Sequence, residues 1–150
     1  MTLLVPFDGS ELAEAALRRA QEFGEVFDME VVVLAAVPLD EAFAVERGWT
    51  DDPASFDPEL FALELRDQAL NIAPQATFRS ETPEDPQDEP FSSTTMNIVR
   101  TIRQVAGETD AEIVFIGSEN AASFSQPLTS IGANVSNDPR YDVHIVRHPD

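Results

Sequence analysis

Short apolar runs alternate with stretches of helical spacing along this chain. The runs Thr2–Phe7, Met29–Val37 and Ala111–Gly117 are too short for buried helices and predict strands that are covered on both faces. The alternation in Ala76–Ser80 predicts a weaker strand at a sheet edge, and Tyr141–Val146 predicts the last strand. The pattern therefore predicts a sheet of five strands.

Apolar residues at helical spacing fill the segments between these strands. The predicted helices run from Leu12 to Gly24, from Asp57 to Pro74, from Ser93 to Gly107 and around Gly132–Asn137. The second begins with Asp57-Pro58-Glu59, which combines an N-cap side chain, a proline at the first helical position and an early acid. The segment Leu39–Phe56 shows no sustained period and is expected to be irregular, and the acidic Glu81–Glu89 is expected to be a solvated loop.

This order of elements predicts a doubly wound α/β fold, a mainly parallel sheet with helices on both faces. Right-handed crossovers place strands two and three on one side of the first strand and strands four and five on the other, which gives the order 3-2-1-4-5. Ligands bind such sheets where the strand order reverses, here between the first and fourth strands. Asp8 and Gly117 come at the ends of these two strands and are expected to flank the crevice. We find no repeat and no boundary, so we expect one domain over residues 1–150.

Charge changes the picture of the surface. The chain has 28 acidic residues and nine basic ones, all of them arginine, for a net charge of -19. Such a chain repels itself at low salt, whereas molar salt screens the repulsion. We interpret the composition as that of a protein from a salt-accumulating cell. Nucleic acid is not an expected partner, because no basic patch is available to neutralise phosphates.

Targeting signals are not visible in the sequence. No apolar run approaches the about 20 residues that a membrane-spanning helix needs. The first residues, MTLLVPFDGS, lack the basic segment of a signal peptide. Cysteine does not occur, which rules out disulfides but decides little about the compartment. We therefore expect a cytoplasmic protein without a membrane partner.

Candidate chemistry is sparse. The sequence has no G-x-S-x-G elbow, no P-loop lysine and no cysteine nucleophile, so we predict no catalytic residues, although slow nucleotide hydrolysis stays open. His144 and His148 are interpreted as surface residues and not as metal ligands. Trp49 has two interpretations, a cover over the pocket mouth or an anchor for its loop. Asp8 also has two, a ligand-binding group or, together with Glu11, the cap of the first helix.

Several of these features resemble one known family. The segment VPFDGSELAEAAL at residues 5–17, the strand at Val31–Val37 and the Ile116-Gly117-Ser118 turn are similar to the universal stress protein family, over essentially the whole chain. The resemblance implies the strand order 3-2-1-4-5 and a homodimer formed through the last strand, Tyr141–Val146. Some members of the family bind ATP and others do not, and their roles concern stress tolerance.

The resemblance also implies candidate nucleotide-binding residues. Asp8 matches an aspartate that holds the adenosine, and the backbone of Ala36 or Val37 matches the adenine contact at the end of the second strand. Gly117 matches the start of the phosphate motif, in which glycines are separated by two and then nine residues and a serine or threonine follows. Ser118 adds a hydroxyl beside Gly117.

The rest of this phosphate motif departs from the family pattern. Asn120 stands at the second glycine, and Ser130 at the third under direct counting. An alternative alignment matches Thr129-Ser130 to the Gly-Ser pair, and another uses Gly132. Under each of these alignments the phosphate motif is degraded relative to the family pattern. Glycine permits the close approach of a phosphate, and its replacement removes that freedom. No arginine occurs between Arg103 and Arg140, so the loop itself offers no side-chain cation.

Three functions follow from these observations. The favoured one is a small dimeric stress-response protein that acts through protein contacts, with little or no ATP binding through the glycine motif. The alternative is a protein that binds an adenine nucleotide, ATP with Mg²⁺ or AMP, in the crevice between the first and fourth strands. An enzyme with an unrecognised substrate is the third, and no sequence feature favours it.

Overall fold

The strands form one parallel sheet in the computed structural model, which describes residues 1–83, 93–118, 120 and 141–149. The strands are β1 (Thr2–Pro6), β2 (Glu30–Ala36), β3 (Thr77–Glu81), β4 (Ala111–Gly117) and β5 (Asp142–Val146). Their order in the sheet is β3-β2-β1-β4-β5, and each neighbouring pair is parallel. The predicted fold class and strand order are confirmed.

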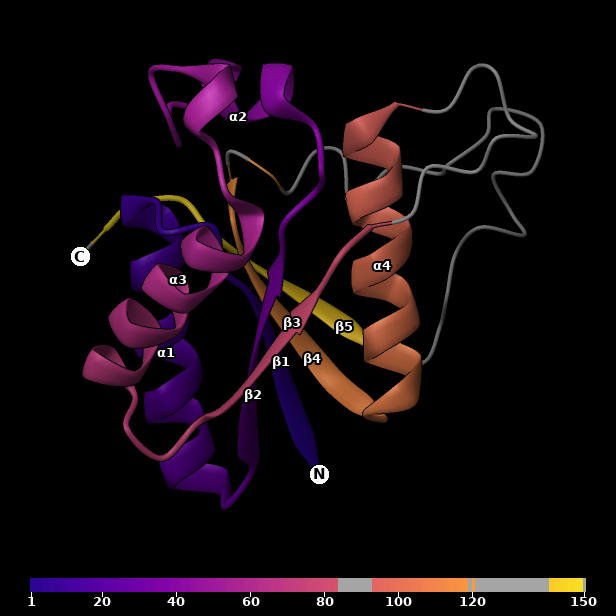
Figure 1. Cartoon of the computed structure of the whole chain (residues 1–150). Helices are drawn as coiled ribbons and strands as arrows, with labels where there is room; N and C mark the ends of the chain where they lie inside the picture. Colours follow the sequence, from indigo (N-terminus) through magenta and orange to yellow (C-terminus); the bar gives the residue numbers. More distant parts are fainter. Residues whose placement is uncertain (84–92, 119, 121–140, 150) are drawn as a thin grey trace, which may run out of the picture.

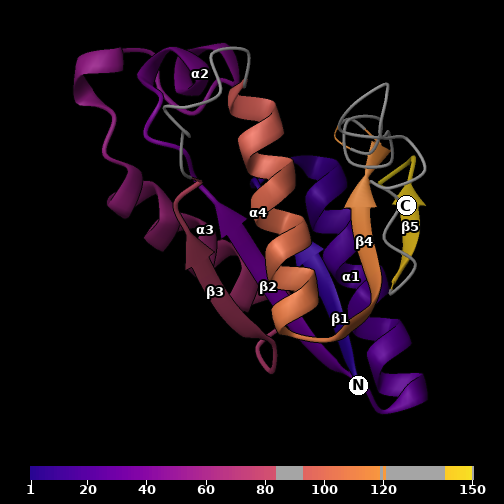
Figure 2. The ribbon, with the colours of Figure 1, turned by 90° about the vertical axis from the view of Figure 1, so that its right-hand side faces the viewer.

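Helices cover both faces of this sheet. α1 (Glu11–Phe27) and α3 (Pro58–Ile72) pack on one face, and α4 (Thr94–Glu108) packs on the other (Figures 1 and 2). The short α2 (Glu41–Glu46) and a 3₁₀ helix at Pro53–Ser55 follow the carboxyl end of β2. They lie above that end of the sheet in Figure 1. This end therefore has walls on two sides, which is the arrangement that a ligand site needs.

Two layers of core side chains hold the helices to the sheet. Leu3 and Val5 of β1 belong to the layer under α1 and α3, whereas Leu4 belongs to the layer under α4. All three are fully buried, because successive side chains of a strand point to opposite faces and both faces are covered. The continuous apolar runs of the central strands follow from this double coverage.

The helix starts carry the caps that the sequence indicates. The Asp57 carboxylate accepts a hydrogen bond from the Glu59 amide at 3.0 Å, and the Ser93 hydroxyl accepts one from the Met96 amide at 3.1 Å. Asp57 and Ser93 are the N-cap residues of α3 and α4, so both predicted starts are confirmed.

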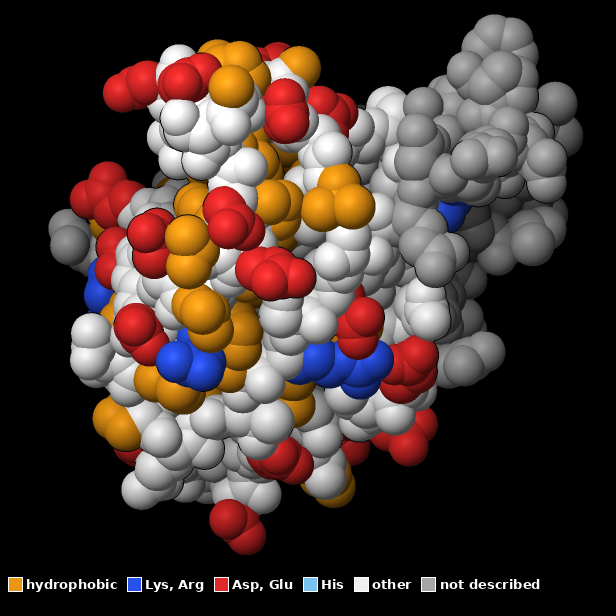
Figure 3. Space-filling view, in the orientation of Figure 1, with side chains coloured by type: hydrophobic (Ala, Val, Ile, Leu, Met, Phe, Trp, Pro, Cys, Tyr) orange, Lys and Arg blue, Asp and Glu red, His pale blue; other side chains and the backbone are white. Residues whose placement is uncertain are grey.

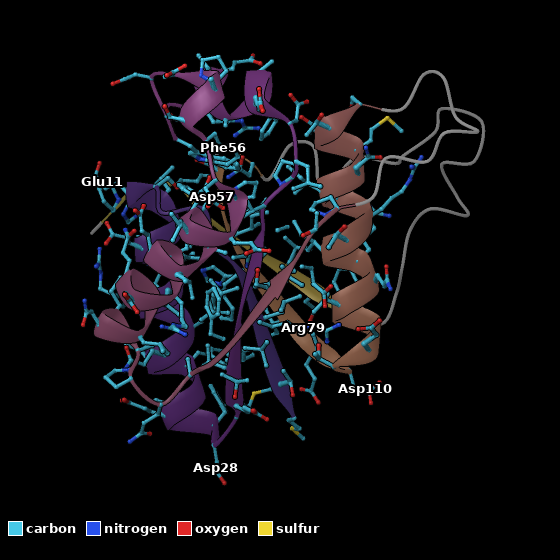
Figure 4. The ribbon with its side chains drawn as sticks, viewed as in Figure 1. Glu11, Asp28, Phe56, Asp57, Arg79 and Asp110 are labelled. Atoms are coloured by element: carbon cyan, nitrogen blue, oxygen red, sulfur yellow. The ribbon has the colours of Figure 1, made fainter. Side chains whose placement is uncertain are left out.

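The predicted ends of two helices at Gly24 and Gly107 are wrong. α1 continues to Phe27 and α4 to Glu108, and Asp28 and Asp110 beyond them take the left-handed conformation, with φ of 55° and 52°. Aspartate tolerates that conformation, so no glycine is needed there. Both aspartates lie at the end of the sheet opposite α2 (Figure 4). Gly24 lies inside α1, where a Cβ would approach the Met29 carbonyl oxygen to 2.8 Å.

The segment Leu39–Phe56 is also more regular than predicted. Asp40 caps α2 by accepting a hydrogen bond from the Phe43 amide at 3.0 Å, and Asp52 caps the 3₁₀ helix. A six-residue helix is too short to show a period in the sequence, which explains the wrong prediction. The predicted helix around Gly132–Asn137 lies outside the described residues.

Candidate functional site

A cleft opens at the carboxyl ends of β1, β2 and β4, between α2 and α4. Its apolar wall consists of Leu34, Ile98, Val99, Ile102 and Ile116. Its polar groups are Asp8, Arg47, Thr95 and Asn120, and Phe43 and Trp49 border it on the α2 side. The cleft lies where the strand order reverses, the position that the sequence indicates for a ligand. An apolar cavity with a few convergent polar groups is typical of small-molecule sites.

Asp8 is held at the floor of this cleft by two hydrogen bonds. The Ser10 amide donates to its Oδ1 at 3.0 Å, and the Asn120 side-chain amide donates to its Oδ2 at 3.1 Å. The helix cap is Ser10, whose hydroxyl accepts from the Ala13 amide at 3.2 Å. The interpretation of Asp8 as the N-cap is therefore wrong, and its carboxylate faces the cleft.

Arg47 brings a cation to the same place. Its Nη1 donates to Oδ1 of Asn120 at 3.0 Å, and its guanidinium carbon lies 4.8 Å from the centroid of the Phe43 ring. Arg47, Asn120 and Asp8 thus form a chain of hydrogen bonds along the cleft lining. Sequence reasoning missed Arg47, because it looked for cations only in the loop after Gly117. The available signal was the four-residue spacing of Phe43 and Arg47 after the capping residue Asp40, which places both on one helix face.

An aromatic cluster fixes the α2 side of the cleft. The Trp49 ring stacks on Phe61 of α3 at 4.7 Å between centroids and meets the edge of Phe43 at 5.5 Å. Phe56 packs against both Trp49 and Phe61, and Figure 4 shows it beside the start of α3. Trp49 therefore anchors its segment, which confirms that interpretation, and it also lines the cleft.

A second contact joins α2 to α4. The Thr94 hydroxyl donates to Oδ2 of Asp40 at 2.6 Å, and the Phe43 amide donates to Oδ1. These bonds favour the ionised carboxylate, so the Thr94 hydroxyl, followed by the Phe43 amide, lowers the pKa of Asp40 below its ordinary value. The two helices that wall the cleft are thus tied together at one end.

The remaining sequence-predicted residues lie in different environments. Ala36 lines the cleft, whereas Val37 is buried and its amide already donates to the Glu81 carbonyl at 3.1 Å. Ser118 is half-buried and is not part of the cleft lining. Ser130 and Gly132 lie outside the described residues.

Gly117 has a packing role that the sequence does not show. A Cβ on this residue would lie 2.8 Å from the Cβ of Leu12 in α1. The missing side chain therefore lets α1 pack close against the end of β4. Within the described residues, this contact is a sufficient reason for a glycine at this position.

The two histidines lie away from the cleft. His144 is exposed on β5 and stacks on Phe115 at 4.8 Å, and His148 lies 3.1 Å from the guanidinium of Arg19. Both are surface residues, as predicted. In the part of the chain that the structure describes, no group of three or more His, Cys, Asp or Glu side chains is placed to hold a metal ion. None of the helices described is long and apolar enough to cross a membrane.

The sheet order and the helices on both faces define a doubly wound α/β domain with a cleft at its switch point. Within that class, the model of the universal stress protein family matches residues 1–147, so the chain belongs to this family. A comparison with curated proteins gave no match. The family predicted from the sequence is therefore confirmed.

Solved structures of the same family share the fold. A universal stress protein from Archaeoglobus fulgidus in complex with dAMP is 22% identical, with a TM-score of 0.59 and 98% of each chain covered. A universal stress protein in complex with cAMP is 20% identical, with a TM-score of 0.53, and the match covers 100% of this chain and 98% of the other. A family protein from Burkholderia pseudomallei is 18% identical, with a TM-score of 0.57, over 98% and 96% of the two chains.

Proposed function

We propose that this chain is a cytoplasmic universal stress protein that binds an adenine nucleotide in the cleft between β1 and β4 and acts by binding, without catalysis. The observation that carries the proposal is the cleft itself, an apolar wall from α4 and the sheet with the Asp8 carboxylate at its floor. The apolar wall suits a purine ring, and the carboxylate can accept a hydrogen bond from a ribose hydroxyl or a ring amine. The dAMP and cAMP complexes of the two similar proteins support this ligand class.

ATP is expected to bind more weakly than in members with the complete glycine motif. Asn120 stands where that motif has a glycine, and its side chain occupies the cleft mouth, bonded to both Asp8 and Arg47. A triphosphate would have to displace this amide and would still find a loop with fewer glycines. We therefore propose that Mg²⁺-ATP is not the main ligand.

Calorimetry with a matched pair of variants tests the proposal. Wild type, Asp8→Ala and Asp67→Ala are titrated with AMP in molar KCl, after circular dichroism has shown each to be folded. Asp67 is an exposed residue of α3 that does not line the cleft, and its replacement removes the same charge. Saturable binding to wild type and Asp67→Ala, weakened at least about tenfold in Asp8→Ala, is expected from the loss of a charged hydrogen-bond partner. The proposal fails if folded wild type does not bind AMP, or if Asp8→Ala binds it equally well.

A homodimer through β5 belongs to the same proposal. β5 pairs with β4 on one side only among the described strands, and an open strand edge is a template for pairing with a second copy. Val143 and Ile145 on this strand are half-buried and pack beside the core under α4. Sedimentation equilibrium in molar KCl should give twice the chain mass, and a monomer at micromolar concentration contradicts the proposal.

A halophilic origin is proposed from the surface charge. Figure 3 shows acidic side chains scattered over the described part of the face in view, with few basic ones among them. Salt bridges within the described residues join Arg66 to Asp67 and Arg79 to Glu81 and Glu108. Solvated carboxylates at this density need salt to screen their mutual repulsion.

Action through protein contacts is a second candidate, and exposed apolar residues favour it. Leu60 and Leu63 of α3 are 59% and 45% exposed, and Leu39 before α2 is 73% exposed. A cross-linking experiment in cell extract with wild type and Leu60→Glu compares their partners. The candidate predicts a partner that the variant loses, and identical cross-links for both proteins count against it.

A further inference from the structure

Arg47 is a cation in the cleft lining whose charged group contacts a neutral amide. Its Nη1 donates to the amide oxygen of Asn120, whereas Arg66 and Arg79 pair with carboxylates. No carboxylate of the described residues lies within 4.0 Å of the Arg47 guanidinium. In a chain with 28 acidic and nine basic residues, a cation in a cleft without an acidic partner is available to an anion.

The position of this guanidinium is fixed by aromatic rings. It lies over the face of Phe43, 4.8 Å from the ring centroid, and Phe43 is 9% exposed and packed edge-to-face against Trp49. A ring face attracts the cation and orients its plane. The guanidinium is therefore held at the cleft mouth before any ligand arrives, which reduces the entropy that binding has to overcome.

We propose that Arg47 binds the phosphate of the nucleotide and gives this cleft a preference for a nucleoside monophosphate. The inference rests on the proposed nucleotide site and adds the group that recognises the phosphate. The planar fork of one arginine matches two oxygens of one phosphate group, and a bond to an anion is stronger than the present bond to an amide. Asn120 is the neutral partner that Arg47 exchanges for the phosphate.

The charges around Arg47 explain the preference for one phosphate. Arg47 is the only cation in the lining of the cleft that the structure describes. The hollow on its other side, beside Trp49 and Phe61, carries Glu64 and is also bordered by Asp8. Further phosphates of a triphosphate would approach these carboxylates without a second cation to balance them. ATP is therefore expected to gain little over AMP, or to bind more weakly.

The contribution of the phosphate is measured as the ratio of the adenosine Kd to the AMP Kd. Both ligands are titrated by calorimetry, and Trp49, the one tryptophan of the chain, provides a fluorescence readout at the cleft. The variants are Arg47→Gln, Arg47→Lys and, as a matched control, Arg66→Gln, which removes an equally charged side chain from the exposed surface of α3. The titrations use the lowest KCl concentration at which circular dichroism shows each protein folded, because salt screens this contact.

The proposal predicts a ratio of about ten or more in wild type and Arg66→Gln, about one in Arg47→Gln, and an intermediate ratio in Arg47→Lys. Adenosine itself should bind all four proteins equally. Inorganic phosphate alone should bind wild type at least about ten times more weakly than AMP, because it lacks the purine contacts.

Three results would overturn the assignment of Arg47. These are an unchanged ratio in Arg47→Gln, equal affinities of wild type for adenosine and AMP, or equal affinities for AMP and inorganic phosphate. The first two leave the proposed nucleotide site intact, since adenosine still binds. If neither adenosine nor AMP binds folded wild type, the proposed function fails and the role of Arg47 fails with it.

Discussion

Replacement of Gly117 by alanine tests whether helix packing or ligand binding requires the glycine at this turn. The added Cβ would lie 2.8 Å from the Cβ of Leu12, 3.3 Å from its carbonyl carbon and 3.6 Å from the Ala13 amide nitrogen. Two of these three atoms belong to the backbone of α1, and the third is attached directly to it. The helix must therefore move away from β4 by several tenths of an ångström. Overpacking of this kind lowers the free energy of unfolding by about 1–3 kcal/mol.

Urea unfolding followed by far-UV circular dichroism in molar KCl measures this loss. With a slope of about 2 kcal/mol per M of urea, a loss of 2 kcal/mol lowers the midpoint by about 1 M. Gly48→Ala is the comparison variant, because an added Cβ there has no atom within 4 Å and only its φ of 78° opposes alanine, at a cost of about 1 kcal/mol. If Gly117→Ala unfolds within about 0.5 kcal/mol of wild type, the packing explanation is refuted and ligand binding becomes the better reason for the glycine.

Three further predictions concern capping, pH and salt. Asp57→Ala removes the N-cap of α3 and should lower the free energy of unfolding in urea by about 1 kcal/mol. Asp67→Ala, within the same helix, should leave it unchanged. Equal losses in the two variants would contradict a capping role for Asp57. The hydrogen bond from Thr94 lowers the pKa of Asp40 in the folded state. Ionised Asp40 therefore stabilises the fold above the ordinary pKa of 3.8, and this contribution is lost as the pH falls through the lowered pKa. Thr94→Val should thus be less stable than wild type at pH 7, and thermal unfolding should show this difference shrinking toward pH 3; a constant difference argues against the contact. Raising KCl from about 0.1 M to 2 M should increase the urea midpoint of wild type, and no increase would contradict a halophilic surface.

The topology could be predicted because both faces of the sheet are covered. Residues 31–35 are all apolar and all buried, as a strand between two helix layers requires. Five strands with helical segments between most of them then permit few arrangements, and right-handed crossovers select the observed order. The helix ends could not be predicted, because Asp28 and Asp110 take the left-handed positions for which glycines at 24 and 107 were the obvious candidates.

The site could be predicted only in part. Asp8 follows β1 directly and Asn120 follows β4 by three residues, so the strand order alone brings together two residues that lie 112 positions apart. Phe43 and Arg47 could not be found in this way, because one lies in a helix of six residues that no period marks and the other is its C-cap. The packing role of Gly117 also depends on α1, a partner that only the folded chain identifies.

A crystal structure of the protein grown with AMP tests the central claim most directly. We expect the adenine against the apolar wall beside Ala36 and Ile98, the sugar near Asp8, and the phosphate within hydrogen-bond distance of the Arg47 guanidinium in place of Asn120. AMP bound at another position, or an empty cleft at AMP concentrations that saturate binding in solution, would contradict it.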